Sequence, residues 1–197
     1  MTDICVIAID TTGLYYWQDE ILEIGIIRID RSRSIIGKFS SLVWPGETAF
    51  QSPSISWALN KRKRKRNDFL LAPSPEKIAN AALAFLGNWK TTQIISFHVP
   101  FTRGFLRRKP WDRIGNGYRW PINLIDMCSK IMGEADSPHC PWSNERNGYE
   151  WPSFMDAFVH FGIQHDFSEM NSVLDSAEVV TKLYLKILEH RETPHES

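Results

Sequence analysis

The residues that point most clearly to chemistry in this sequence are six consecutive cations at positions 61–66. Such a run attracts phosphate groups, and each neutralised phosphate adds salt-sensitive affinity for nucleic acid. Because like charges repel one another and are not buried together, we expect an exposed loop or the start of a helix here. A solvated face without a ligand and a nuclear-import signal in a eukaryotic chain stay open. The six residues are Lys61, Arg62, Lys63, Arg64, Lys65 and Arg66.

A second group of cations lies between positions 103 and 113. It would contact phosphates from the same side of the molecule if the fold brings the two groups together. Two nearby tryptophans, Trp111 and Trp120, could stack on bases, although packing inside the protein is the commoner role of tryptophan. The cations of this group are Arg103, Arg107, Arg108, Lys109 and Arg113.

The charge balance of the whole chain limits both interpretations. The sequence contains 23 Lys and Arg and 23 Asp and Glu residues, so its formal net charge is zero. This excludes a protein that coats nucleic acid by its overall positive charge. Any affinity for nucleic acid must therefore come from a local patch.

Length and composition predict one domain with one core. A 43% hydrophobic share over 197 residues is enough for such a core, and we expect a domain at 1–190 and a polar tail at 191–197. No apolar run approaches the roughly 20 residues of a membrane helix, and the first residues lack the basic region of a secretion signal. The three cysteines show no disulfide or zinc spacing, which is typical of a reducing compartment. We expect a cytoplasmic protein, or a nuclear one if the cationic run is an import signal.

The first elements that must position these residues are strands. Residues 4–9 form a continuous apolar, mostly β-branched run, which is typical of a strand buried on both faces. It ends at the turn residues 10–13. Alternating apolar residues predict two further strands at 19–30 and 35–44. Because short connections join the three strands, we expect an antiparallel meander.

Helices alternate with strands over the rest of the chain, as apolar residues recur there at helical spacing. This order is typical of an α/β fold in which a mixed sheet is flanked by helices. The expected elements are a helix at 76–89, a strand at 93–97, a helix at 102–108, a strand leading into a helix at 122–132, a loop at 137–152, and helices at 153–162 and 172–189.

This element order and four short segments resemble the DnaQ-like DEDDh 3′–5′ exonucleases, a family that includes proofreading subunits and ribonuclease T. Residues 7–14, Ile-Ala-Ile-Asp-Thr-Thr-Gly-Leu, followed by residues 19–25, are similar to the family's first motif and second strand. Residues 97–106, 124–127 and 171–177 are similar to later family segments in the same order. The resemblance implies a ribonuclease H-like α/β fold: a mixed sheet, with a three-stranded antiparallel meander plus parallel strands, flanked by helices.

The family's chemistry needs carboxylates that this sequence lacks. Family members hold two Mg²⁺ ions about 4 Å apart and use a histidine as general base. The resemblance implies that the carboxylate positions are Ala8, Asp10, Thr102 and Ser176 here, and that the histidine position is Asn171. Only Asp10 keeps a carboxylate, and one carboxylate holds Mg²⁺ weakly. We therefore expect no cofactor and no catalysis, with Asp10 as the one weak candidate metal ligand, although all five positions should converge.

Two other carboxylates could restore the site. Asp175 lies beside Ser176, but consecutive residues of a helix point about 100° apart. Asp126 occupies a position that the family often fills with Asp without using it as a metal ligand. If Asp10, Asp175 and Asp126 formed a rebuilt site, the protein would be an active 3′–5′ exonuclease that needs Mg²⁺ or Mn²⁺. This alternative stays open.

The groove for a 3′-terminal nucleotide could persist without catalysis. In the family, the backbone of the Thr-Thr-Gly-Leu segment, its Leu side chain and a Phe of the second motif hold this nucleotide. The resemblance therefore implies contacts with nucleic acid at Thr11, Thr12, Gly13, Leu14 and Phe101. The alternative is that Leu14 and Phe101 belong to the hydrophobic core and that Gly13 serves the turn.

Three hypotheses for the function follow. The first is a catalytically degenerate exonuclease-like protein that binds a single strand or 3′ end, or that acts with a protein partner as a scaffolding subunit of a nucleic-acid-processing complex. The second is the active exonuclease with a rebuilt metal site. The third is a protein-interaction module whose groove is filled by side chains. A homodimer is left open because some members of the family are dimeric, and no contact with a membrane is expected.

Overall fold

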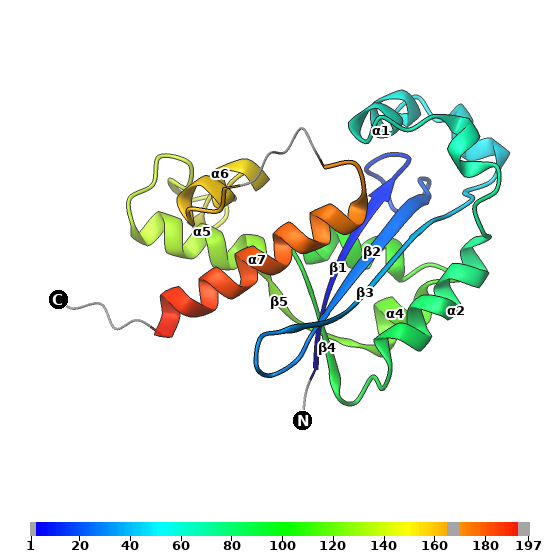
Figure 1. Ribbon diagram of the computed structural model, residues 1–197. Helices are drawn as coiled ribbons and strands as arrows, with labels where there is room; N and C mark the ends of the chain where they lie inside the picture. Colours follow the sequence, from blue (N-terminus) through cyan, green and yellow to red (C-terminus); the bar gives the residue numbers. More distant parts are fainter. Residues whose placement is uncertain (1–2, 165–169, 193–197) are drawn as a thin grey trace.

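The computed structural model describes residues 3–164 and 170–192 (Figure 1). Its main sheet contains β1 (Asp3–Thr11), β2 (Ile21–Ile29), β3 (Ile35–Leu42), β4 (Thr92–Ser96) and β5 (Arg119–Asn123). The strand order is β3-β2-β1-β4-β5. The first three strands are antiparallel, whereas β4 runs parallel to β1 and β5 runs parallel to β4. The expected meander with added parallel strands is confirmed, and the architecture is that of a ribonuclease H-like sheet.

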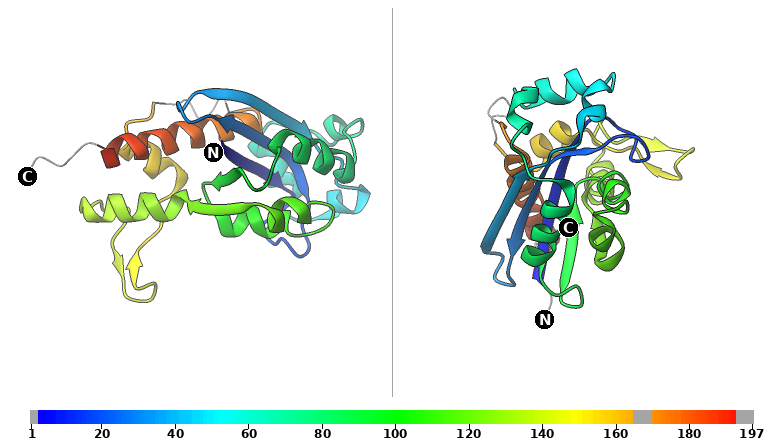
Figure 2. Two further views of the ribbon diagram at one scale, coloured as in Figure 1. Left: turned by 90° about the horizontal axis from the view of Figure 1, so that it is seen from below. Right: turned by 90° about the vertical axis from the view of Figure 1, so that its right-hand side faces the viewer.

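Helices cover both faces of this sheet (Figures 1 and 2). The helices are α1 (Ile55–Lys61), α2 (Pro75–Leu86), α3 (Val99–Leu106), α4 (Asp112–Gly117), α5 (Leu124–Glu134), α6 (Phe154–His160) and α7 (Val173–Glu192). Residues of α2, α3 and α4 share one hydrophobic cluster with the sheet, and residues of α5, α6 and α7 share the other. Two short 3₁₀ helices, η1 (Glu47–Gln51) and η2 (Arg66–Phe69), lie on either side of α1 in the sequence.

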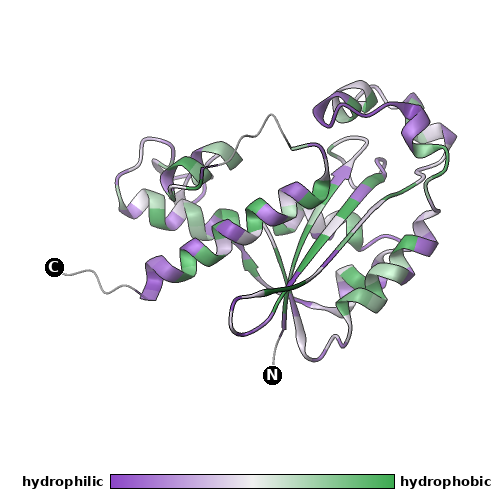
Figure 3. Ribbon diagram, viewed as in Figure 1, coloured by the Kyte–Doolittle hydropathy of each residue, from purple (hydrophilic) through white to green (hydrophobic). Residues whose placement is uncertain are grey.

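The central strand β1 is buried on both faces because successive side chains point to opposite sides of a sheet. Ile7 contributes to the cluster with α2, α3 and α4, and Val6 contributes to the cluster with α5, α6 and α7; neither side chain is exposed. Figure 3 shows this apolar character along the strands and polar residues on the outer sides of the helices. Burying one such side chain stabilises the folded state by about 1.5–3 kcal/mol. These contacts hold β1 in place between the two layers of helices.

A glycine in β2 lets α7 begin directly against the sheet. A Cβ atom added at Gly25 would lie 2.8 Å from the backbone oxygen of Val173, the first residue of α7. Only a residue without a side chain permits this approach. The close contact fixes the first turn of α7, which carries Ser176, beside the carboxyl end of β1.

The structure departs from the expected elements where an element is short. The segment at 137–152, expected to be a loop, contains a small hairpin of β6 (Trp142–Ser143) and β7 (Gly148–Tyr149). Helices α1 and α4 were not expected, because they have seven and six residues and bury few side chains. Helix α7 continues through Glu192, so two residues of the expected tail are helical. The rest of that tail lies outside the described residues.

Within residues 3–164 and 170–192, no helix is long and apolar enough to cross a membrane. The three cysteines are free and buried. Burial raises the pKa of the Cys5 and Cys128 thiols to about 12, so both thiols serve as packing groups.

Candidate functional site

The candidate site is a cavity of about 420 Å³ at the carboxyl ends of β1 and β4. Four of the five positions implied by the resemblance line this cavity, namely Ala8, Asp10, Thr102 and Ser176. The fifth, Asn171, follows Met170, which also lines the cavity. The fold therefore brings together the end of β1, the start of α3 and the start of α7, as the spacing of the motifs predicts.

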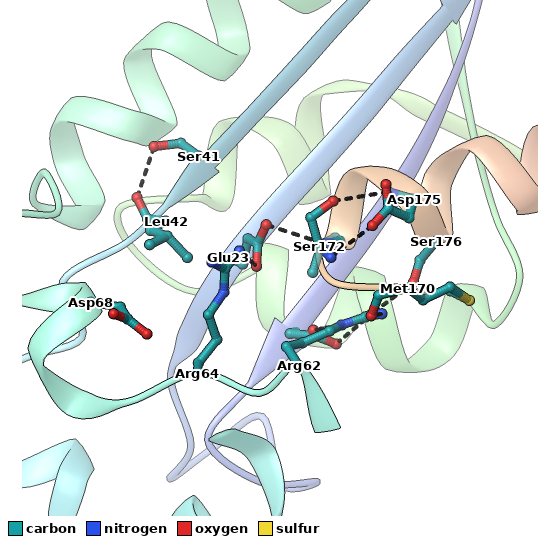
Figure 4. Close-up of polar contacts among 12 residues, drawn as sticks. Glu23, Ser41, Leu42, Arg62, Arg64, Asp68, Met170, Ser172, Asp175 and Ser176 are labelled. Carbon is teal, nitrogen blue, oxygen red and sulfur yellow. Dashed lines mark hydrogen bonds and ion pairs between the residues drawn. The ribbon is translucent and has the colours of Figure 1, made fainter. Parts of the chain in front are cut away.

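An arginine from the cationic run fills the polar side of this cavity (Figure 4). Arg62 is only 6% exposed. Its Nε donates to Asp10 Oδ2 at 2.6 Å, its Nη2 donates to Ser176 Oγ at 2.6 Å, and its Nη1 donates to the backbone oxygen of Met170 at 3.2 Å. Lys61 Nζ donates to the other oxygen of Asp10 at 2.9 Å. One carboxylate thus holds two cations.

The expectation that the cationic run is not buried is wrong for Arg62. A buried guanidinium is tolerated when a charge partner and further acceptors surround it, and here Asp10 and two oxygens from the start of α7 supply them. The rest of the run agrees with the expectation of a loop or helix start: α1 ends at Lys61, residues 62–65 form a connecting segment, and Arg66 begins η2.

The other arginines of the run also pair with acids. Arg64 Nη2 lies 3.3 Å from Glu23 Oε2, and Arg66 Nη2 lies 2.5 Å from Glu47 Oε2. The exposed members are Lys61, Lys63, Lys65 and Arg66. Much of the positive charge that the sequence displays is therefore neutralised within the fold.

Two carboxylates face each other across β1 and β2, and their pKa values move in opposite directions. Asp10 and Glu23 are direct partners in the strand register. Burial alone would raise the pKa of Asp10, but Lys61 and Arg62 together outweigh it and lower that pKa. Burial raises the pKa of Glu23, and the hydrogen bond from the Val173 N–H and the charge of Arg64 reverse this only in part.

The position of the second-motif carboxylate holds a hydroxyl that is already hydrogen-bonded. Thr102 Oγ1 lies 2.8 Å from Ser96 Oγ at the end of β4, and both residues are buried. Nearby, His98 also lines the cavity, and its buried Nε2 has no hydrogen-bond partner among the described residues. Burial lowers the pKa of His98, so this imidazole is neutral at pH 7.

The two carboxylates that could rebuild the site are engaged elsewhere. Asp175 caps α7, where its Oδ2 accepts from the Ser172 N–H at 2.8 Å (Figure 4). Asp126 accepts from Asn123 Nδ2 and from Trp151 Nε1, each at 2.7 Å, beside the β6–β7 hairpin.

The donor set does not fit a pair of divalent ions. In the part of the chain that the structure describes, no three His, Cys, Asp or Glu side chains are grouped closely enough to hold a metal. Asp10 is the one carboxylate among the residues described as lining the cavity, and it is bound by Lys61 and Arg62. Mg²⁺ requires several hard oxygen ligands in place of its water shell, and this cavity supplies cations in their place.

The residues expected to hold a terminal nucleotide divide into two kinds. Thr11, the last residue of β1, and Thr12, the next residue, are buried. A Cβ atom on Gly13 would lie 2.4 Å from the Asp19 carboxylate, so this glycine is needed for the close turn. Leu14, by contrast, is 64% exposed, so the alternative that it is a core residue is wrong. Phe101 is half-buried and lines the cavity.

Two cations of the second basic group donate to backbone oxygens of other segments, one in α4 and one in the β1–β2 loop. Arg103 Nε donates to the backbone oxygen of Gly115 at 2.8 Å, and Arg108 donates to backbone oxygens of the β1–β2 loop. Trp111 is 3% exposed and belongs to the core, so it is not a stacking surface. The exposed cations of this group are Arg107, Lys109 and Arg113.

The sequence analysis overlooked a set of exposed aromatic residues, here called the aromatic rim. It consists of Tyr15, Tyr16, Trp17 and Trp57, which are between 46% and 62% exposed. Trp57 shares a small cavity with Leu14, Lys61 and Asp10, next to the main one. The sequence carried a signal for it, because three consecutive aromatic residues between two predicted strands are not explained by burial in a core.

Comparisons with known proteins agree with this fold. No family model and no curated protein sequence matches the chain. A crystal structure of full-length 3′-exonuclease matches with a TM-score of 0.68 and 12% identity, over 96% of this chain and 82% of that protein. E. coli exonuclease I in complex with a dA16 oligonucleotide matches with a TM-score of 0.68 and 16% identity, over 98% of this chain.

Cell-death related nuclease 4 matches with a TM-score of 0.68 and 9% identity, over 96% of this chain and 64% of that protein. The chain spans only 42% of the length of exonuclease I. The chain therefore has the ribonuclease H-like fold of these exonucleases.

Proposed function

We propose that this protein is a catalytically degenerate exonuclease-like protein that binds single-stranded nucleic acid near its 3′ end without divalent metal ions. The observation that carries this proposal is the buried pair of Arg62 and Asp10 in the cavity at the end of β1. The fold supports it as well, since one of the matched structures is exonuclease I with a bound oligonucleotide. Another is described as 3′-end specific recognition of histone mRNA stem-loop by 3′-exonuclease.

The charges of the cavity favour an anion. The charged residues described as lining it are Asp10, Lys61 and Arg62, so cations outnumber carboxylates. Neighbouring cations disfavour a metal ion and attract a phosphate. The Lys61 side chain is 45% exposed, and its two remaining N–H groups can donate to a phosphate oxygen. Lys61 is the group that we assign to a backbone phosphate.

The apolar part of the cavity suits a nucleobase. Its walls include Phe97, Phe101 and Phe154 together with Met170 and Val180. Aromatic side chains stack on bases with little sequence preference. A terminal nucleotide could therefore place its base among these side chains and its phosphate near Lys61.

The donor set gives no support to the hydrolysis of this nucleotide. Hydrolysis by metal ions requires them to activate water and stabilise the leaving oxygen, and the residues of this cavity do not fit such ions. Asn171 stands at the position of the family's general base, and an amide does not accept a proton from water at neutral pH. For this reason we propose binding without cleavage.

The test combines a binding assay with a cleavage assay on the full chain. We expect fluorescence anisotropy to show that a linear single strand binds more tightly than a circular one of the same length, and that a 3′-labelled strand stays intact in Mg²⁺ or Mn²⁺. Lys61→Ala should weaken binding about fivefold, near 1 kcal/mol for one lost charge-assisted contact. Lys90→Ala, an exposed lysine beyond α2, is the matched control.

Two results would overturn the proposal. One is the absence of binding by the wild-type protein. The other is a shortening of the labelled strand that Asp10→Asn abolishes, which would restore the hypothesis of an active exonuclease.

A further inference from the structure

The four residues of the aromatic rim expose large apolar side chains at the protein surface. Tyr15, Tyr16, Trp17 and Trp57 are 51%, 46%, 62% and 57% exposed. The ring centroids of Tyr15 and Trp17 lie 4.9 Å apart, and those of Tyr16 and Trp17 lie 5.2 Å apart. Gathered apolar groups of this kind on a protein surface mark interaction sites.

The β1–β2 loop that carries three of these rings is braced from inside. The Asp19 carboxylate accepts from the Tyr15 N–H at 2.9 Å. Arg108 Nη1 donates to the backbone oxygens of Tyr16 and Asp19, at 2.5 and 2.7 Å. Gly104 of α3 has no side chain and so leaves room for the Tyr16 ring, since a Cβ atom there would lie 2.9 Å from that ring. The rings are therefore held outward before any ligand arrives, which lowers the entropy cost of binding.

Helix α1 lies beside the β1–β2 loop (Figure 1) and carries the fourth ring and a cation. Ser54 Oγ at the start of α1 donates to the backbone oxygen of Thr12 at 2.6 Å, which ties the helix to the β1–β2 loop. Trp57 and Lys61 are four residues apart and share one face of α1, with Lys61 Nζ 5.8 Å from the Trp57 ring centroid. A flat ring thus lies beside the cation that contacts Asp10.

The small cavity beside Trp57 adjoins the main cavity. Asp10, Lys61 and Phe101 line both the main cavity and the small one, and Trp57 and Leu14 line the small one. A strand whose last nucleotide sits in the main cavity would leave it past Trp57 and reach the β1–β2 loop. Flat rings beside a cationic groove are the recurring composition of surfaces that bind single strands.

We propose that the aromatic rim is a stacking surface for the bases that precede the 3′-terminal nucleotide of a single strand. This inference rests on the proposed function, because the last nucleotide in the cavity sets the direction of the strand. Since every base presents a flat face, the rim would bind different sequences with similar affinity. The occupant is nucleic acid rather than protein because the exposed Lys61 ammonium lies 5.8 Å from the Trp57 ring, and a cation beside flat rings suits a phosphate and its base.

The experiment compares a long and a short strand on the same variants. Oligothymidylates of two and twelve nucleotides, each with a free 3′ end, are titrated in EDTA. In Trp17→Ala/Trp57→Ala, we expect the affinity for the twelve-nucleotide strand to fall by about tenfold or more, as stacked bases are lost. The affinity for the two-nucleotide strand should fall much less than that for the twelve-nucleotide strand, because only one of its bases precedes the terminal nucleotide.

Matched controls separate stacking from other causes. Trp89→Ala removes an equally exposed tryptophan, 54% exposed beyond the end of α2, and should leave both affinities unchanged. Trp17→Phe/Trp57→Phe keeps flat rings and should restore most of the long-strand affinity. If the double alanine variant does not fold, each single alanine variant carries the same expectation.

The outcomes distinguish this inference from the proposed function. If the wild type binds neither strand, the proposed function fails. If the wild type binds the long strand and the double alanine variant binds it equally well, the function stands and the stacking inference is wrong. In that case the rim would be assigned to a protein partner.

Discussion

The floor and the rim of the candidate site are built on opposite principles. On the floor, Arg62 donates to both Asp10 and Ser176, so these three polar side chains are hydrogen-bonded within the protein. At the rim, Trp17 and Trp57 are left exposed on rigid supports. The difference teaches that charge in the sequence need not become charge on the surface. The exposed surface of the rim is aromatic, whereas the three arginines of the cationic run pair with acids of the same fold.

The first prediction tests the floor and has the largest expected effect. Replacing Arg62 by Ala leaves the buried Asp10 carboxylate with Lys61 alone and removes the bonds to Met170 and Ser176. Breaking a buried ion pair in this way costs about 3–5 kcal/mol. We expect that loss in the free energy of unfolding, measured with urea at pH 7.

The control for this variant is Arg66→Ala, which breaks an exposed pair with Glu47. It should cost less than about 1 kcal/mol. Equal losses in the free energy of unfolding for the two variants would show that Arg62 stabilises the protein no more than a surface arginine does.

The second prediction compares the effect of pH on the two facing carboxylates, Asp10 and Glu23. The pKa of Asp10 is lowered in the folded state, so its contribution is present above the unfolded pKa of about 3.9 and is lost as the pH falls through the folded value. Asp10→Asn should therefore cost about 2 kcal/mol at pH 7. The difference from wild type should shrink as the pH falls below 4.

Glu23 should behave in the opposite way. Its pKa is raised in the folded state, so the native state binds more protons and stability falls as the pH rises above the unfolded value of about 4.3. Glu23→Gln should consequently be neutral or slightly stabilising at pH 7. Urea unfolding from pH 3 to pH 8 measures both profiles, and parallel profiles for the two variants would contradict the assignment.

The third prediction disturbs the rim while sparing the floor. Gly104→Ala pushes the Tyr16 ring outward, because the added Cβ atom would approach it to 2.9 Å. We expect a stability loss of about 1 kcal/mol together with a few-fold weaker affinity for a twelve-nucleotide strand. Gly117→Ala is the control, because its Cβ atom would meet nothing within 4 Å. If the two variants bind the long strand equally, the position of the Tyr16 ring has no effect on binding.

The smallest effect on stability is expected from the exposed lysines of the cationic run. Replacing Lys61, Lys63 and Lys65 by Ala should flatten the dependence of log affinity on log salt by about one to three, the number of phosphates released. Affinities for different sequences should fall together, because phosphate contacts carry no base information. A triple Ala variant at Lys90, Lys130 and Lys186 is the control. An unchanged slope at positions 61, 63 and 65 would mean that the run is solvated or contacts a protein.

The fold could be predicted from the sequence because its central elements have strong patterns. β1 is a continuous apolar run, β2 is rich in isoleucine, and α2 and α7 show helical spacing of apolar residues, so the predicted bounds of these elements agree with the structure within a few residues. α1 could not be predicted in the same way. It buries only Ala58 among its described side chains, and a helix with so little apolar surface leaves no periodic pattern.

The candidate site could be predicted only in part. The resemblance to the exonuclease motifs predicted that Ala8, Thr102 and Ser176 converge, and in the structure they line one cavity from β1, α3 and α7. The burial of Arg62 could not be predicted, because it depends on Asp10, 52 positions earlier in the chain. A run of like charges gives no local sign of which member finds a distant partner.

The most direct test of the central claim is whether binding needs a metal ion. The dissociation constant of a 3′-labelled single strand is measured by fluorescence anisotropy, in EDTA and in Mn²⁺ at matched ionic strength. Since Lys61 and Arg62 supply the positive charge of the site, the two constants should agree within about twofold. Affinity about tenfold or more tighter in Mn²⁺, with the gain lost in Asp10→Asn, would contradict the account.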